Sequence, residues 1–90
     1  MIKDERYDTV KTLLTVGHFG EFKHIFKVIP KTIVANDLGI HGNRFDKLIQ
    51  YPERFVIWDI ERIARLIEID LPVLMDLILK DIRKRRPPTL

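Results

Sequence analysis

Residues 31–50 read KTIVANDLGIHGNRFDKLIQ, and this stretch predicts two short helices joined by a tight turn. In its first half, apolar or small side chains recur at a spacing that gathers them on one helical face: Val34, Ala35 and Leu38. Gly39 follows at the point where a helix needs a left-handed residue in order to end. Ile40 is an apolar residue inside the turn, and this predicts that the turn packs inward.

The second half of the stretch predicts an amphipathic helix. Its apolar face carries Phe45, Leu48 and Ile49, and its other side is polar and mostly basic, with Asn43, Arg44, Lys47 and Gln50. A helix with a narrow apolar face and a basic outer face is suited to a DNA groove.

These residues resemble the helix-turn-helix of the lambda-repressor-like (XRE-type) DNA-binding family. In that family a small residue in the first helix lets the second helix pack across it, and Ala35 matches this position. The family pattern also has a glycine at the turn, matched by Gly39, and apolar residues where this chain has Val34, Leu38, Ile40, Phe45 and Leu48. The resemblance covers residues 20–79. It implies an all-α fold, a five-helix lambda-repressor-like DNA-binding domain with one additional N-terminal helix.

The resemblance also implies which residues contact DNA. Asn43, Arg44 and Lys47 occupy places from which the family reads base edges, and their side chains can pair with adenine or guanine. Lys31 stands where the family has a glutamine that contacts a phosphate, which a lysine can contact as a point charge. The full predicted set is Lys31, His41, Gly42, Asn43, Arg44, Lys47, Gln50 and Arg54.

Several of these positions have a second interpretation. Lys31 could be an ordinary solvated lysine, and Arg54 could pair with a carboxylate of its own chain. Gly42 offers no side chain where the family often has a reading residue, so it indicates either close backbone approach or a looser helix start. Asp46 would be repelled by phosphate unless it accepted from a cytosine, and we expect it to pair within its own helix.

The composition describes one small globular protein. Of 90 residues, 46% are hydrophobic and 32% charged, and no run approaches the ~18 apolar residues of a membrane-spanning helix. The N-terminal residues MIKDERYD contain no apolar signal region. The absence of cysteine excludes disulfides, thiolate chemistry and cysteine-bound zinc. We therefore expect a cytoplasmic protein with no cofactor, no metal and no membrane partner.

Positive charge is unevenly distributed. The net charge is +3, and it is +4 over residues 80–90, +2 over residues 21–50 and −3 over residues 51–79. The positive charge therefore lies on the predicted motif and on the C-terminal end, and the helix after the motif is not expected to face phosphate.

The chain divides into an N-terminal helix and linker at residues 1–19, the helix-turn-helix domain at residues 20–83, and a basic tail at residues 84–90. Tyr7, Val10 and Leu14 share one face of the first helix, predicted over residues 4–16, which either covers the domain surface or mediates self-association. Residues 21–29 predict another helix, which Pro30 ends. The tail is either a solvated end or a basic arm that contacts phosphates.

Residues 55–69 predict a helix that closes the core from behind. Its buried face is expected to hold Ile57, Ile60, Ile63, Ala64 and Ile67. Trp58 is expected in the core or at an interface rather than as a ligand platform. Glu68 stands where the family has a glycine stop, so the helix exit is expected to differ.

The last helix, predicted over residues 71–82, has too many apolar residues for one face. Leu71, Leu74 and Ile78 can pack on the core, which leaves a second apolar face: Met75, Leu79 and Ile82. We expect this face to form a homodimer interface. The alternative is that the N-terminal helix covers it.

Catalysis is not expected. None of the three histidines lies four residues from another, there is no glycine-rich phosphate loop, and the chain has no serine. The sequence thus predicts binding of double-stranded DNA, as a dimer, in transcriptional regulation. Two alternatives remain: a protein-interaction module, and an antitoxin that uses its C-terminal helix on a protein partner.

Overall fold

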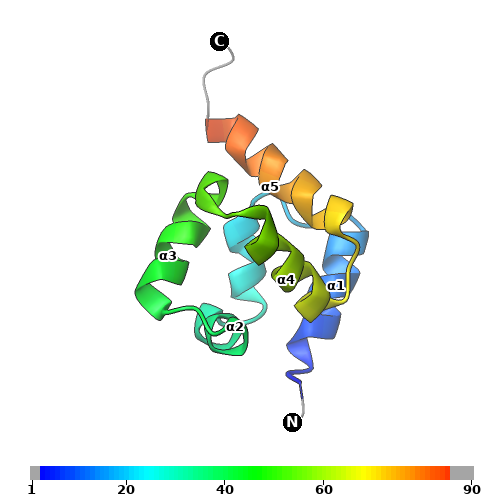
Figure 1. Cartoon of the computed structure of the whole chain (residues 1–90). Coiled ribbons are helices and arrows are strands. Elements are labelled where there is room, and N and C mark those ends of the chain that lie inside the picture. The colour runs from blue at the N-terminus through cyan, green and yellow to red at the C-terminus, as the bar shows by residue number, and fades with distance from the viewer. Residues whose placement is uncertain (1–2, 86–90) are drawn as a thin grey trace.

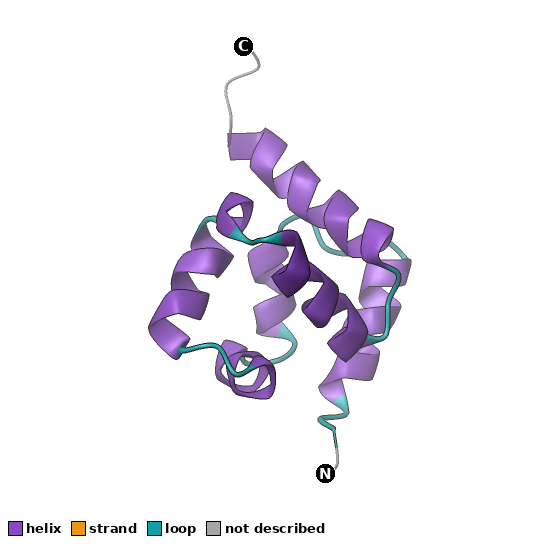
Figure 2. Ribbon diagram, viewed as in Figure 1, coloured by secondary structure: helices purple, strands orange, loops and turns teal. Residues whose placement is uncertain are grey.

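The computed structural model describes residues 3–85, and these form only helices and loops. There are five α-helices and two short 3-10 helices, and no strand occurs within the described range (Figures 1 and 2). In chain order they are α1 (Arg6–Thr15), η1 (Phe22–Lys27), α2 (Lys31–Leu38), α3 (Gly42–Gln50), η2 (Pro52–Arg54), α4 (Ile57–Ile67) and α5 (Leu71–Arg85). The prediction of an all-α protein is confirmed.

The helices enclose one apolar core, and a group of aromatic rings lies within it. Phe22 and Phe45 are fully buried. The edge of one ring meets the face of another between Phe22 and Phe26, Phe22 and Phe55, and Phe26 and Phe45, with centroids 5.4 to 5.6 Å apart. Such contacts add to the free energy gained from burial alone. The rings come from η1, α3 and the segment before α4, so they join the motif to the rest of the fold.

Helix α1 packs against the body of its own chain, where it contacts α4 and α5. Tyr7, Val10 and Leu14 are buried, as the sequence predicted for that face. The Tyr7 hydroxyl donates a 2.7 Å hydrogen bond to the Asp37 carboxylate of α2. Of the two interpretations of the first helix, the structure supports the one in which it covers the domain surface.

The Tyr7 hydrogen bond should make stability depend on pH in the alkaline range. Burial, and then the hydrogen bond to Asp37, raise the pKa of the Tyr7 phenol above its usual value. A raised folded-state pKa contributes stability below the unfolded pKa of ~10, and this stability is lost as the pH rises through the folded value. Tyr7→Phe should cost about 1 kcal/mol at pH 7, and the difference from the native protein should shrink above pH ~10. Urea unfolding at pH 7 and at alkaline pH measures both, and a difference that stays constant would contradict this account.

The segment after α1 departs from the predicted helix at residues 21–29. It forms the shorter 3-10 helix η1, whose first amide is held from a distant part of the chain: the Phe22 N–H donates to the Asp81 carboxylate of α5 at 3.1 Å. Asp81 is only 5% exposed. The start of η1 is bonded to α5, and its phenylalanines pack against the other aromatic rings. The geometry of this segment is therefore set by core packing and not by the helix propensity of its residues.

Residues 31–50 form two helices joined by a tight turn, as predicted. Helix α2 ends at Gly39, which has the left-handed values φ 70° and ψ 27°, and the Ile40 N–H donates back to the Ala35 carbonyl at 2.9 Å. Ile40 is buried, so the turn packs inward. Figure 1 views α2 nearly along its axis while α3 runs across the view, so the two helices cross steeply. A short glycine-containing turn with such a crossing is typical of this motif.

Helix α4 begins later than predicted, and this changes one assignment. Ile60, Ile63, Ala64 and Ile67 are buried, but Ile57 is 66% exposed, so its predicted place on the buried face is wrong. Phe55, in the extended segment before the helix, is buried instead. The first turn of α4 therefore has one exposed side, with Ile57 and Trp58, and one buried side, with Asp59 and Ile60.

The exit from α4 keeps left-handed geometry without a glycine. Glu68 has φ 63° and ψ 47°, and the Ile69 N–H donates to the Ala64 carbonyl at 2.9 Å. The expected change in helix exit is therefore not found. Glu68 instead adopts a backbone conformation that is unfavourable for a residue with a side chain.

Helix α5 buries much of its circumference within the chain. Leu74, Leu77 and Ile78 are buried, and Met75 and Ile82 are partly buried against the core, while Leu79 remains 37% exposed. Helix α5 also includes Lys84 and Arg85, which the sequence placed in the tail; residues 86–90 lie outside the described residues. Within the described range, no helix combines the length and apolarity that crossing a bilayer requires.

Candidate nucleic-acid interface

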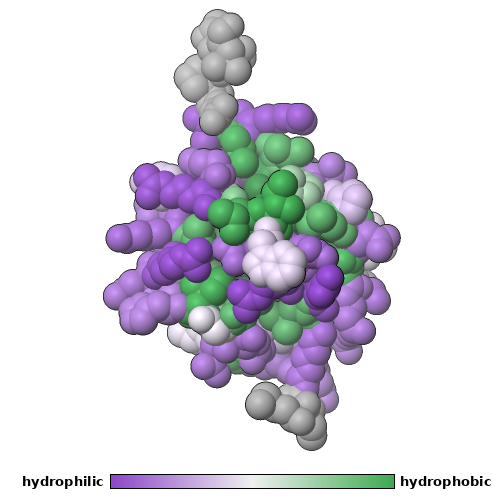
Figure 3. All heavy atoms as spheres, viewed as in Figure 1, coloured by the Kyte–Doolittle hydropathy of each residue, from purple (hydrophilic) through white to green (hydrophobic). Residues whose placement is uncertain are grey.

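Helix α3 has one buried side and one solvent-facing side. Phe45 and Leu48 point into the core. Every residue of the predicted outer face is exposed, namely Asn43, Arg44, Lys47 and Gln50, and Gly42 at the start of the helix is exposed too. Figure 3, in which α3 lies on the left, shows hydrophilic side chains over that region. The residues predicted to contact base edges thus lie together on one accessible face of the helix.

His41 caps the start of this helix. Its Nδ1 atom accepts a hydrogen bond from the Asn43 N–H at 3.2 Å, which satisfies one of the amides that a helix start leaves without a partner. Gly42 is the first helical residue, and a Cβ added there would meet nothing within 4 Å. No contact inside the protein requires glycine at this position, so its lack of a side chain affects only what can approach from outside.

Asp46 pairs across the motif rather than within its own helix. Its carboxylate lies 2.7 Å from the Lys31 ammonium at the start of α2, so the expected pairing inside α3 is wrong. Both side chains are about half exposed, so this pair adds little to stability. It places Lys31 beside the start of α3, and a small hollow of about 140 Å³ lies between the two helices there.

Arg44 is held by a carboxylate that the sequence did not single out. Its guanidinium lies 3.3 Å from Asp59, whose side chain is 9% exposed, while Arg44 itself is 56% exposed. Arg62 lies on the other side of Asp59, at 3.8 Å, and donates to the Leu38 carbonyl at the end of α2. Asp59, at the start of α4, therefore holds α3 through Arg44. Arg62, one turn later, holds the end of α2 through the Leu38 carbonyl.

A sequence signal for Asp59 exists, although it is weak. Asp59 is the third residue of its helix, where a carboxylate interacts favourably with the positive end of the helix dipole. It also precedes Ile63 by four positions, which places it at the border of the buried face rather than on the polar one.

Lys47 and Arg54 are the basic residues of the predicted set that no carboxylate of the described chain neutralises within 4 Å. Lys47 is exposed on the outer face of α3. Arg54, in η2, stacks over the Tyr51 ring with its guanidinium carbon 5.1 Å from the centroid. The alternative of an ion pair for Arg54 is therefore not what residues 3–85 show. Both charges remain available to an anion from outside.

The resulting surface is basic but moderate in charge. Arg44 and Lys31 carry their charges next to Asp59 and Asp46, whereas Lys47 and Arg54 contribute theirs in full. Within residues 3–85 no cluster of three or more histidine, aspartate or glutamate side chains could hold a metal ion. The side chains of this surface can donate hydrogen bonds and attract negative charge.

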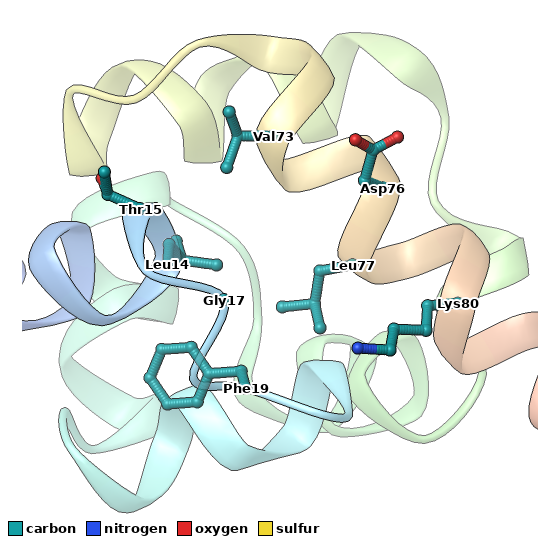
Figure 4. Close-up of a pocket in the computed structure, with 8 residues that line it drawn as sticks. All are labelled: Leu14, Thr15, Gly17, Phe19, Val73, Asp76, Leu77 and Lys80. Carbon is teal, nitrogen blue, oxygen red and sulfur yellow. The ribbon is translucent and has the colours of Figure 1, made fainter.

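A separate pocket of about 230 Å³ lies between the end of α1, the turn after it and α5 (Figure 4). Its walls are mainly apolar, with Leu14, Phe19, Val73 and Leu77, and Lys80 extends toward Phe19 from the α5 side. The volume is below the ~300 Å³ of a typical small-molecule site. None of its residues belongs to the helix-turn-helix, and we assign it no role.

Comparisons with protein-family models, with curated proteins and with solved structures found no match to this chain. What the chain does must therefore be inferred from its own residues.

Proposed function

We propose that this protein binds double-stranded DNA by placing α3 in the major groove, as a lambda-repressor-like regulator of transcription acting as a homodimer. The observation that carries the proposal is the two-sided character of α3. Phe45 and Leu48 are buried against the fold, while four outer-face residues of the predicted set are exposed and have basic or amide side chains: Asn43, Arg44, Lys47 and Gln50. Amide and basic side chains are the groups that read base edges in the major groove.

In this proposal the residues divide by role. Asn43, Arg44 and Lys47 face the bases, and Asp59 restrains Arg44 so that fewer guanidinium orientations are available to it. Arg54 and Lys31 contact phosphates on either side of the groove. Phosphate contacts would supply much of the affinity and the base contacts the discrimination. Gly42 would let the backbone approach the duplex closely, since no side chain stands there.

The competing function is that of a protein-interaction module or an antitoxin that uses the apolar C-terminal helix on a partner. A protein partner bound at α5 has less support, because two of the apolar residues that it would contact, Met75 and Ile82, are already partly buried against the core of the same chain. The exposed basic face of α3 also has no purpose in a module that only binds proteins.

Binding to random-sequence duplex DNA across a salt series tests the proposal. We expect affinity to fall steeply with salt, and Lys47→Ala to weaken binding several-fold, because it removes a positive charge that no carboxylate of the described chain neutralises. Lys11→Ala is the matched control, because Lys11 is also an exposed helical lysine but lies on α1, away from the motif. Absence of binding at low salt, or equal effects of the two variants, would reject the DNA-binding proposal.

A further inference from the structure

Three large apolar side chains are exposed in succession where α4 begins, one just before the helix and two in its first turn. Val56, Ile57 and Trp58 are 57%, 66% and 65% exposed. The sequence predicted burial for Ile57, and for Trp58 a place in the core or at an interface. With the core excluded for both, these three residues form an apolar surface that residues 3–85 leave uncovered.

The apolar surface continues onto the neighbouring helix. Helices α4 and α5 are in contact, and α5 contributes Leu79, which is 37% exposed, with the partly buried Met75 and Ile82 nearby on the same helix. In Figure 3 hydrophobic atoms lie at the centre of the view, over the start of α4, and continue upward over α5. We call the surface made by Val56, Ile57, Trp58 and Leu79 the α4–α5 patch.

We propose that the α4–α5 patch is the interface with a second copy of this chain, with Ile57 and Trp58 at its centre. The first reason is area. Four side chains of this size and exposure present on the order of 400 Å² of apolar surface, as large as the largest patches of ordinary monomers. That is about half of the ~800 Å² that each partner buries in a standard interface, and a polar rim can supply the rest.

The second reason is charge. The four side chains of the patch carry none, and the nearest charge in the same turn, Asp59, is buried and already lies beside Arg44 and Arg62. Two copies of this protein can therefore bring their patches together without burying a charged group at the centre of the interface. A strongly acidic or basic partner would find no countercharge at its centre.

The third reason rests on the proposed DNA binding. One copy has only Lys47 and Arg54 as predicted contacts without a carboxylate nearby, and few phosphate contacts give weak binding. A symmetric pair doubles the number of contacts. The patch begins two residues after Arg54 and its turn carries Asp59, which holds Arg44, so pairing at the patch would order the groups that face DNA.

The test is made on the protein without DNA, by sedimentation and by tryptophan fluorescence from about 1 μM to about 1 mM. Trp58 is the only tryptophan, so its emission reports directly on the patch. We expect a concentration-dependent shift of the emission to shorter wavelength, together with a change from monomer to dimer. A monomer with unchanged emission over the whole range would overturn the proposal.

Two variants locate the interface. Ile57→Glu and Trp58→Glu place a carboxylate in the first turn of a helix, where it is favourable to the helix itself, so folding should be retained. Each should weaken dimerisation at least about tenfold. Val16→Glu is the matched control, since Val16 is an apolar residue 71% exposed at the end of α1, outside the patch. A dimer that survives both α4 variants, or is lost equally in the control, would contradict the assignment.

The two proposals can fail separately. A protein that binds random DNA at low salt yet stays monomeric would leave the DNA-binding proposal standing and reject the dimer interface. A dimer disrupted by Ile57→Glu that binds no DNA would do the reverse.

Discussion

Phe45→Ala is expected to lower the free energy of unfolding by about 3–5 kcal/mol, a large part of the ~5–15 kcal/mol available to a domain of this size. Phe45 is fully buried, and its ring contacts Phe26 at 5.6 Å and Phe55 at 6.4 Å between centroids. Alanine would leave a cavity between η1, α3 and the start of α4. Because Phe45 is the largest buried side chain of α3, the outer face of this helix should lose its fixed position when the core is disrupted.

Chemical denaturation measures this effect, and two variants make it specific. Phe45→Leu keeps most of the volume and should cost clearly less than alanine. Lys47→Ala, on the exposed side of the same helix, should change stability by less than about 0.5 kcal/mol. A cost below about 1.5 kcal/mol for Phe45→Ala would mean that the site is not packed as described.

Asp59→Ala is expected to have the second largest effect, and it should act on both stability and binding. It removes a buried carboxylate that lies beside Arg44 and Arg62 and that favours the start of α4. Since both arginines remain partly solvated, the expected loss is about 2 kcal/mol rather than the larger cost of an isolated buried charge. Arg44 would then be free to move, so affinity for random DNA should rise while discrimination between sequences falls.

Glu61→Ala is the matched control for Asp59→Ala. It removes the same charge from the same helix, but Glu61 pairs only with the exposed Arg65, at 2.8 Å, so its cost should be below about 0.5 kcal/mol. Denaturation and competition binding between a selected site and random duplex separate the two variants. Equal behaviour of the two variants would show that Asp59 acts through net charge alone and does not orient Arg44.

The motif was predictable from sequence because its determinants are local. The apolar spacing of Val34, Ala35 and Leu38, the glycine stop and the apolar turn residue each depend on neighbours within a few positions, and the structure has them as predicted. The same holds for the buried face of α1 and for the exposed outer face of α3. DNA contact itself remains a prediction.

The pairing of charges was not predictable, because it depends on which helices meet. Asp46 lies beside Asn43 and Gln50 in the sequence, yet it pairs with Lys31, 15 positions earlier, because α2 and α3 cross there. Asp81 accepts from the Phe22 amide, 59 positions away, and so fixes η1 onto α5. Local spacing gives no information on either contact.

The sequence by itself determined the helical class, the two helices and tight turn of residues 31–50, and the outer face of α3, since periodicity and turn chemistry act over one or two helical turns. Only the tertiary structure decided which apolar residues remain uncovered. Ile57 has the spacing of a core residue, but Ile57 and Trp58 face solvent at the start of α4, while Phe55 before them is buried. Burial depends on where a helix begins relative to its neighbours, and that is set by the packing of the whole chain.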